Sequence, residues 1–183
     1  MNPFVAEYKR YKTLLENALK QLSDENFFNH LGPADNSVAV ILKHLSGNFI
    51  SRFTDFLNTD GEKTWRNRET EFKVEESSRN ALEKQWQAAW KILKQNVFTL
   101  GHEDMQREVK IRGVRFTVHE ALTRSLAHFS FHVGQVVFLA KHFAGPDWQY
   151  LTIPPGQSEQ YNANPDLEKG FETKKSGRTG KST

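Results

Sequence analysis

Two histidines one helical turn apart are the residues of this chain best suited to chemistry. His128 and His132 lie in the segment LAHFSFHVGQVVFLAK, whose apolar residues recur at helical spacing. At about 100° per residue, positions four apart differ by about 40° around a helix, so both imidazoles can point at one site. The same face carries four residues suited to a protein interior, Ala121, Ser125, Val136 and Leu139. We therefore expect the pair to face the interior, at a spacing that suits a metal ion.

A third histidine, His44, lies in the segment VILKHLSGN and can also face the interior. Three neutral imidazoles around one ion leave coordination positions open for water or substrate, as in catalytic rather than structural metal sites. The chain has no cysteine, which excludes a thiolate metal site, a cysteine nucleophile and a disulfide scaffold. The alternative interpretation is that each histidine is an ordinary core residue, because a pair with this spacing also occurs by chance on many helices.

The remaining histidines and two neighbouring tryptophans are expected to have no role at this site. Four histidines fall in a loop, beyond a helix or near helix ends, where we expect exposed side chains: His30, His102, His119 and His142. Trp86 and Trp90 follow the apolar stripe of a predicted helix. That pattern is more typical of a core than of a cofactor-binding site.

Four long helices are predicted to position the three histidines. Apolar periodicity and capping signals predict helices over about 3–22, 37–57, 77–99 and 117–143. Asn2 and Pro3 suit a cap and a first helical residue, and Thr117 with Glu120 forms the capping-box pattern. The broad apolar faces are those of helices packed in a bundle. The predicted fold is therefore all-α, a four-helix bundle.

The connections between these helices differ in character. Ser23 with Asn26 is expected to open a short turn, and residues 58–74 are charged and aperiodic, as in a long crossing between the second and third helices. The alternation in REVKIRGVRFTV predicts a small hairpin or extended excursion before the fourth helix. Residues 147–162 are expected to form an extended strip, anchored by Trp148, Tyr150, Leu151 and Ile153.

The basic charge of the chain is concentrated at its end. The sequence has a formal net charge of +3 and a pI of about 9.1, but residues 169–183 alone carry five Lys or Arg against one Glu. The rest is nearly neutral, which argues against a nucleic-acid partner. We predict a domain over 1–160 and a disordered basic tail over 161–183. The tail's GRTGKST imitates a phosphate-binding loop without its first glycine or its flanking strand and helix.

The chain carries no segment that predicts a membrane location. It has no run approaching the roughly 20 apolar residues that a spanning helix needs. Its start, MNPFVAEYKRYK, lacks the charged-then-apolar order of a signal peptide. The expectation is therefore a cytoplasmic protein without a membrane partner.

Several ordered blocks of this sequence resemble one known superfamily. LAHFSFHVGQVVFLAK, VILKHLSGN, SRFTDFLNTDGEKTWRNRETEF and LTIPPGQS together resemble the DinB-like (DinB/YfiT-like) superfamily, in an uncharacterised domain-of-unknown-function branch, over about residues 4–160. The resemblance implies a four-helix bundle of up-down-down-up order. It also implies a divalent metal ion, most often nickel or zinc, held by one histidine of the second helix and two of the fourth. Those positions match His44, His128 and His132.

The resemblance implies a site more firmly than a reaction. Characterised relatives include transferases and isomerases that use a low-molecular-weight thiol such as bacillithiol, mycothiol or glutathione. It therefore implies a metal-dependent thiol S-transferase, or a hydrolase, acting on a small molecule, in a protein expected to be a homodimer. The alternative is a non-catalytic metal-binding or stress-related dimeric module. The sequence leaves open whether the chain is an enzyme.

Five further polar residues are candidates for supporting roles. Arg66 and Arg68 in the long crossing and Arg124 on the last helix are candidates for binding an anionic substrate, although each also suits a solvated or salt-bridged surface position. Asn48 and Gln135 are candidates for orienting the metal ligands, with ordinary packing as the alternative.

Overall fold

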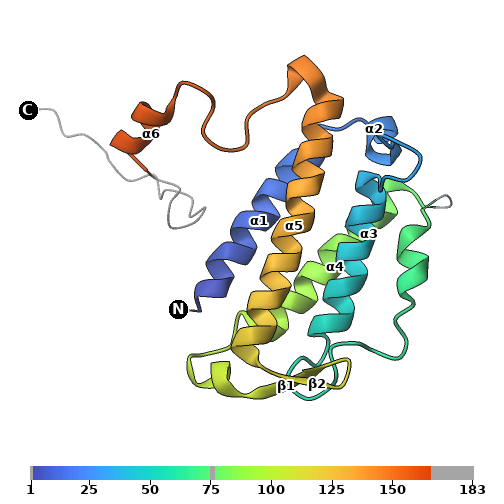
Figure 1. Cartoon of the computed structure of the whole chain (residues 1–183), viewed down its shortest axis with the longest axis vertical. Coiled ribbons are helices and arrows are strands. Elements are labelled where there is room, and N and C mark those ends of the chain that lie inside the picture. Colours follow the sequence, from blue (N-terminus) through green and yellow to red (C-terminus); the bar gives the residue numbers. More distant parts are fainter. Residues whose placement is uncertain (1, 75–76, 166–183) are drawn as a thin grey trace, which may run out of the picture.

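Long helices dominate the computed structural model of this chain, which describes residues 2–74 and 77–165. The described residues form six α-helices, of which four are long and lie side by side (Figure 1): α1 (Pro3–Leu19), α3 (Val38–Phe53), α4 (Arg79–Val97) and α5 (Val118–Ala144). Two are short, α2 (Asp24–Phe28) and α6 (Ser158–Ala163). Short 3-10 helices are η1 (Arg68–Phe72), η2 (Glu103–Gln106) and η3 (Gly145–Asp147), and the hairpin consists of β1 (Glu108–Ile111) and β2 (Val114–Thr117). The predicted mainly helical fold is confirmed.

Side-chain caps fix where the long helices begin. Asn2 accepts a hydrogen bond from the Phe4 amide and Pro3 follows it, while Thr117 and Glu120 complete the predicted capping box before α5. Ser37 and Ser78 cap α3 and α4 in the same way. Each cap satisfies an amide that the first helical turn leaves without a partner.

Two helices end earlier than their apolar patterns predict. Helix α1 ends at Leu19 instead of Leu22, and α3 ends at Phe53 instead of residue 57. After α3 the chain turns at Asp55, whose φ of 49° lies in the left-handed region and cannot continue a right-handed helix. Leu22 and Phe56 are nevertheless buried in the core. The apolar pattern in the sequence therefore extends past the ends of the helices, because buried core residues also lie in the turns that follow them.

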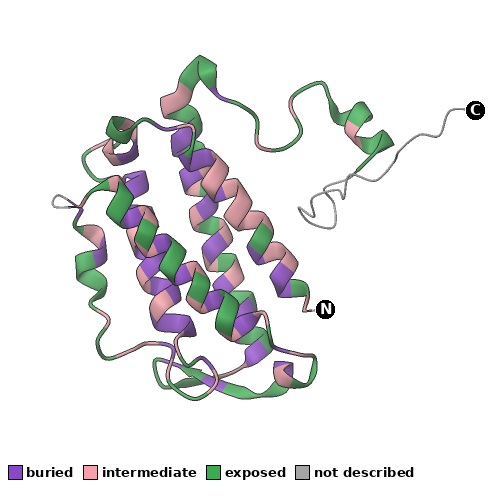
Figure 2. Ribbon diagram, turned by 180° about the vertical axis from the view of Figure 1, so that it is seen from behind, coloured by how far each residue is buried: buried purple, intermediate pink, exposed green. Residues whose placement is uncertain are grey.

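The core is built around aromatic rings, one from each long helix. Tyr8 of α1 and Phe129 of α5 have ring centroids 6.1 Å apart, Phe49 of α3 lies 5.0 Å from Phe129, and Trp86 of α4 lies 5.6 Å from Phe49. All four side chains are almost completely buried, and Figure 2 shows the buried positions on the inner faces of the helices. Trp86 is therefore a core residue, as predicted.

The hairpin and the crossing from α3 to α4 are bound to each other at one end of the helices. Strands β1 and β2 pair in antiparallel register, Glu108 opposite Thr117 and Ile111 opposite Val114, which confirms the predicted hairpin. Asp60 in the crossing accepts hydrogen bonds from the amides of Arg112 and Gly113 at the hairpin turn, at 2.8 and 2.7 Å. This contact holds the crossing and the hairpin together beside the C-terminal end of α3 and the N-terminal end of α5.

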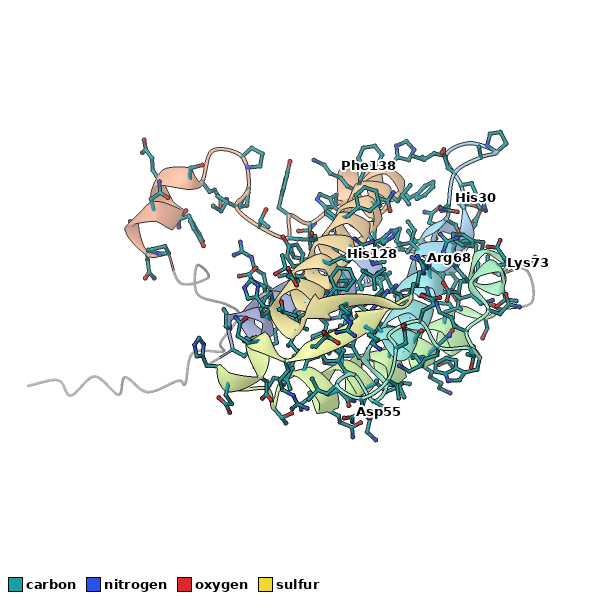
Figure 3. The ribbon with its side chains drawn as sticks, turned by 60° about the horizontal axis from the view of Figure 1, so that its bottom comes forward. His30, Asp55, Arg68, Lys73, His128 and Phe138 are labelled. Carbon is teal, nitrogen blue, oxygen red and sulfur yellow. The ribbon has the colours of Figure 1, made fainter. Side chains whose placement is uncertain are left out.

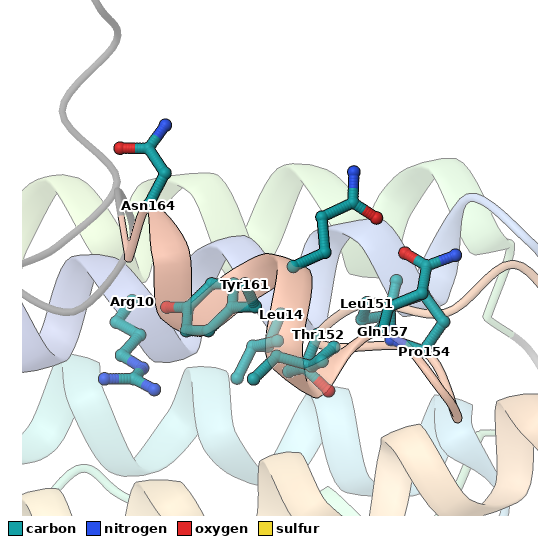
Figure 4. A pocket seen from close by; sticks show the side chains of 10 residues that line it. Arg10, Leu14, Leu151, Thr152, Pro154, Gln157, Tyr161 and Asn164 are labelled. Atoms are coloured by element: carbon teal, nitrogen blue, oxygen red, sulfur yellow. The ribbon is translucent and has the colours of Figure 1, made fainter.

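The segment after α5 leaves the upper end of that helix and extends away from the long helices to α6 (Figure 1). Of its predicted anchors, Trp148 is buried and Leu151 half-buried, but Tyr150 and Ile153 are 49% and 39% exposed and do not anchor it. A cavity of about 390 Å³ separates this segment and α6 from Arg10 and Leu14 of α1 (Figure 4).

Two further predictions concern the ends and the surface of the molecule. The predicted boundary at residue 160 falls inside α6, and most of the predicted tail, residues 166–183, lies outside the described residues. The four histidines predicted to be exposed are exposed. Within 2–74 and 77–165, no helix is both long and apolar enough to cross a membrane.

Candidate metal centre

The three predicted histidines come together between α3 and α5. His128 Nε2 lies 3.2 Å from His44 Nε2 and 3.1 Å from His132 Nε2, and one ligand nitrogen from each ring falls within 4.8 Å of the others. Two nitrogens bound to one tetrahedral zinc ion at 2.0–2.1 Å would lie roughly 3.3 Å apart. The spacing of the ring nitrogens therefore fits a single divalent ion.

Two of the rings are held by hydrogen bonds at their other nitrogen. His44 Nδ1 lies 2.8 Å from Glu71 Oε2, and His132 Nδ1 lies 2.7 Å from Gln135 Oε1. Because both partners are acceptors, a neutral ring carries its proton on Nδ1 and leaves the Nε2 lone pair directed at the centre. This is the arrangement in which a metal-binding histidine is oriented and made more basic by its neighbour.

Glu71 of η1 connects His44 to Arg66. It was not predicted as a site residue from the sequence. Its Oε1 accepts a hydrogen bond from Arg66 Nε at 2.8 Å and its Oε2 another from Arg66 Nη2 at 3.0 Å, in addition to the contact with His44. The side chains of Arg66 and Glu71 are only 3% and 7% exposed. A buried, bidentate ion pair of this kind holds the carboxylate rigidly against His44.

Gly47 explains how Glu71 can approach α3 so closely. A Cβ at this position would lie 2.3 Å from Glu71 Oε1 and 2.7 Å from its Cδ. Glycine in the middle of a helix costs about 1 kcal/mol relative to alanine, so its presence needs a compensating contact. Here glycine makes room for the carboxylate one turn from His44.

The electrostatic environment favours the neutral forms of His128 and His132 and the ionised form of Glu71. Burial, assisted by the neighbouring His132 and His44, lowers the pKa of His128 to about 3. Burial also lowers the pKa of His132, against the effect of the hydrogen bond that its ring donates to Gln135. Burial alone would raise the pKa of Glu71, but hydrogen bonds from His44 and Arg66 lower it. Neutral imidazole nitrogens supported by an ionised carboxylate are suited to bind a cation without first losing protons.

The trio opens into a cavity of about 450 Å³ between α3, α5, η1 and the hairpin. Phe72 stacks on His44, with ring centroids 5.6 Å apart, and Phe131 lines the cavity from α5. In Figure 3, His128 on α5 and Arg68 on η1 lie close together in this region. The volume is within the range of about 300–1,000 Å³ typical of small-molecule sites.

The structure places all five predicted supporting residues on this cavity. Gln135 contacts His132, and Asn48 is buried one turn beyond His44. Arg66 is held by Glu71 and Glu62. Arg68 lies over Phe72, 4.9 Å from the ring centroid, and Arg124 is exposed at the edge.

An ion held by the three histidines would lie in an open site. Three neutral imidazoles leave room for one or more further ligands, and a divalent ion held by them would supply a Lewis acid that lowers the pKa of a bound water or thiol. The cavity next to the trio would admit a small molecule to that position.

A family model matches most of the chain. The model of a family described as protein of unknown function (DUF1572) matches residues 1–157. No curated protein and no solved structure matches the chain. The matched residues include α3, α5 and the crossing with η1, which together form the histidine site. This chain therefore belongs to the DUF1572 family, whose function is uncharacterised.

Proposed function

We propose that this chain is a divalent-metal-binding protein of the DinB-like superfamily and that it is a metal-dependent enzyme acting on a small molecule. The observation that carries the proposal is the convergence of three Nε2 atoms, two of them aligned by Glu71 and Gln135, at the wall of a cavity. Nickel and zinc are the proposed ions, because imidazole ligands suit both.

Contacts between the helices support the proposed up-down-down-up four-helix bundle. Asn2 at the start of α1 bonds to Val97 at the end of α4, and the Phe4 ring at the start of α1 contacts His119 at the start of α5. These contacts are those of an antiparallel and a parallel pair.

The proposed reaction is transfer of a low-molecular-weight thiol to an electrophile, with hydrolysis as the second possibility. The ion would stabilise the thiolate at neutral pH. The open cavity favours either reaction over the non-catalytic alternative, because structural metal sites are closed by protein ligands. The absence of cysteine from the chain is compatible with a thiol supplied from outside.

The experiment is an assay of metal-loaded protein with an aryl halide electrophile and a panel of thiols, namely bacillithiol, mycothiol, glutathione and cysteine. We expect one thiol to support thioether formation, and chelation or the His128→Ala change to reduce the rate to background. Re-addition of the ion should restore activity only in the chelated wild type. A uniformly negative panel with a fully loaded site would overturn the transferase proposal and favour the hydrolase or the binding module.

The proposed homodimer uses the outer face of α5. This face carries four exposed residues at helical spacing, Ala127, Phe131, Gly134 and Phe138. The two phenylalanines are 62% and 65% exposed. A Cβ at Gly134 would meet nothing within 4 Å, so the helix surface is open there. A second copy of α5, packed antiparallel across Gly134, would cover both phenylalanines with its own.

The Phe138→Glu change should convert the dimer to a monomer. A charge placed in the centre of an apolar interface is left without a partner when the interface closes. The measurement is the molar mass by analytical ultracentrifugation. Val114→Glu, at a residue 58% exposed on the hairpin, is the matched control and should remain dimeric. A wild-type monomer, or a Phe138→Glu dimer of unchanged affinity, would contradict the proposal.

A further inference from the structure

Arg52 is a buried cation whose charge the described part of the protein leaves largely unsatisfied. It lies on α3 two turns beyond His44, is only 8% exposed, and lines the cavity. Its Nη1 is fully buried and has no hydrogen-bond partner within the described residues. Buried guanidinium groups are normally paired, because removing an unpaired charge from water is costly.

The carboxylates that act electrostatically on Arg52, Glu62 and Asp60, have other partners, and Asp60 accepts hydrogen bonds from the amides of Arg112 and Gly113. Glu62, the acidic group that acts on Arg52 most strongly, lies 3.3 Å from Arg66 Nη1 and 3.3 Å from Arg112 Nη2. Glu71 is held by Arg66 and His44. Among the described residues, the cavity lining contains no Asp or Glu but five arginines: Arg52, Arg66, Arg68, Arg112 and Arg124. The cavity therefore has an excess of positive charge even before an ion binds.

The local structure makes room for Arg52. A Cβ at Gly61 would lie 2.9 Å from Arg52 Nη1 and 3.0 Å from its Cδ. Gly61 is fixed in turn, because its amide donates to the Lys110 carbonyl at 2.8 Å and its carbonyl accepts from Ser51 Oγ at 3.0 Å. The crossing and the hairpin thus enclose the arginine instead of neutralising it.

Arg52 and the histidine trio lie at two ends of one cavity. His44, Asn48 and Arg52 follow each other at four-residue spacing along α3, and all line the cavity. Eight residues of helix span about 12 Å along the axis, and the Arg52 guanidinium lies against Gly61 of the crossing. A ligand that contacts both the ion and Arg52 must therefore be elongated, with a different group at each end.

We infer that the cavity binds a small, elongated anion whose carboxylate or phosphate group pairs with Arg52 while its other end reaches the histidine trio. The inference rests on the proposed function, because the second end requires the ion. A charge-assisted hydrogen bond from the guanidinium to an oxyanion would compensate the buried charge of Arg52. Arg124 and Arg112, which are more exposed, would attract the anion at the mouth of the cavity.

The test uses metal-loaded full-length protein and isothermal titration calorimetry with succinate, inorganic phosphate and the neutral analogue succinamide. We expect succinate or phosphate to bind and succinamide not to bind. The anion with the higher affinity shows whether the site prefers a carboxylate or a phosphate group. Arg52→Met, which keeps the length and apolar contacts of the side chain, should weaken anion binding about 10- to 100-fold. Arg115→Met removes one charge from an exposed residue outside the cavity and should leave binding unchanged.

A second readout separates ligand binding from structural support. Because Arg52→Met removes an unpaired buried charge, its melting temperature should equal or exceed that of the wild type. A destabilised Arg52→Met protein, unchanged anion binding in this variant, or equal binding of succinamide would overturn the inference. Metal content is measured on each sample. A wild type that retains its ion but binds neither succinate nor phosphate counts against this inference alone, whereas a wild type that binds no ion counts against the proposed function.

Discussion

Replacing Glu71 by alanine should lower the free energy of unfolding by about 3–5 kcal/mol and weaken metal binding about 10- to 100-fold. The first effect follows because Arg66, whose side chain is only 3% exposed, would keep only its longer contacts with Glu62 at 3.3–3.5 Å. The second follows because His44 would lose the acceptor that orients its ring. Denaturant unfolding of the metal-free protein and competition with a chromogenic chelator measure the two effects separately.

Two further variants make the Glu71 prediction specific. Glu69→Ala changes a carboxylate of the same 3-10 helix whose side chain is 83% exposed, and should alter stability by less than about 0.5 kcal/mol. Glu71→Gln keeps the shape and one acceptor but removes the charge, so it should fall between Glu71→Ala and the wild type in both measurements. Equal stability of Glu71→Ala and Glu69→Ala would show that the buried ion pair does not support the site.

A divalent ion should stabilise the wild type strongly and the His128→Ala variant far less. An ion that binds only the folded state adds about 3–4 kcal/mol at 100 to 1,000 times its dissociation constant. Burial lowers the pKa of His128 to about 3, so at neutral pH its Nε2 is available to the ion without loss of a proton. Removing His128 leaves two nitrogens on different helices, His44 and His132, which form a much weaker site.

The measurement is thermal unfolding with and without zinc or nickel after treatment with a chelator. His142→Ala, at an exposed histidine of the same helix, is the control and should retain the full ion-dependent shift. An equal shift in His128→Ala would exclude the trio as the site of stabilisation. Absence of a shift in the wild type with either ion would exclude nickel and zinc as ligands of the folded protein.

The parts of the site that could be predicted from sequence lie on regular helices. His128 and His132 share a face because helical periodicity is fixed, and the buried neighbours Ala121 and Val136 confirm which face points inward. The capping box and the hairpin could also be predicted, since each depends on residues close together in the chain. Helix ends were harder to predict, because Leu22 and Phe56 belong to the core although they lie outside helices.

Glu71 and Arg52 could not be assigned from sequence for different reasons. Glu71 lies in a charged, aperiodic crossing, where no repeating pattern distinguishes a buried carboxylate from its exposed neighbours. One signal was present, because Gly47 in the middle of a helix indicates that another group approaches closely. Arg52 lies on an apolar helix face, but whether a buried arginine has a partner depends on residues that only tertiary packing brings near it. Helix α6 was missed because it buries none of its side chains.

The central claim is that His44, His128 and His132 hold one ion. Elemental analysis of protein from cells grown with nickel and zinc in the medium, purified without added metal or affinity chelators, tests it most directly. We expect about one nickel or zinc ion per wild-type chain and nearly none in His128→Ala, with His142→Ala at the wild-type level. Metal-free wild type from cells grown with ample nickel and zinc, or a His128→Ala variant that retains its full ion content, would contradict the claim.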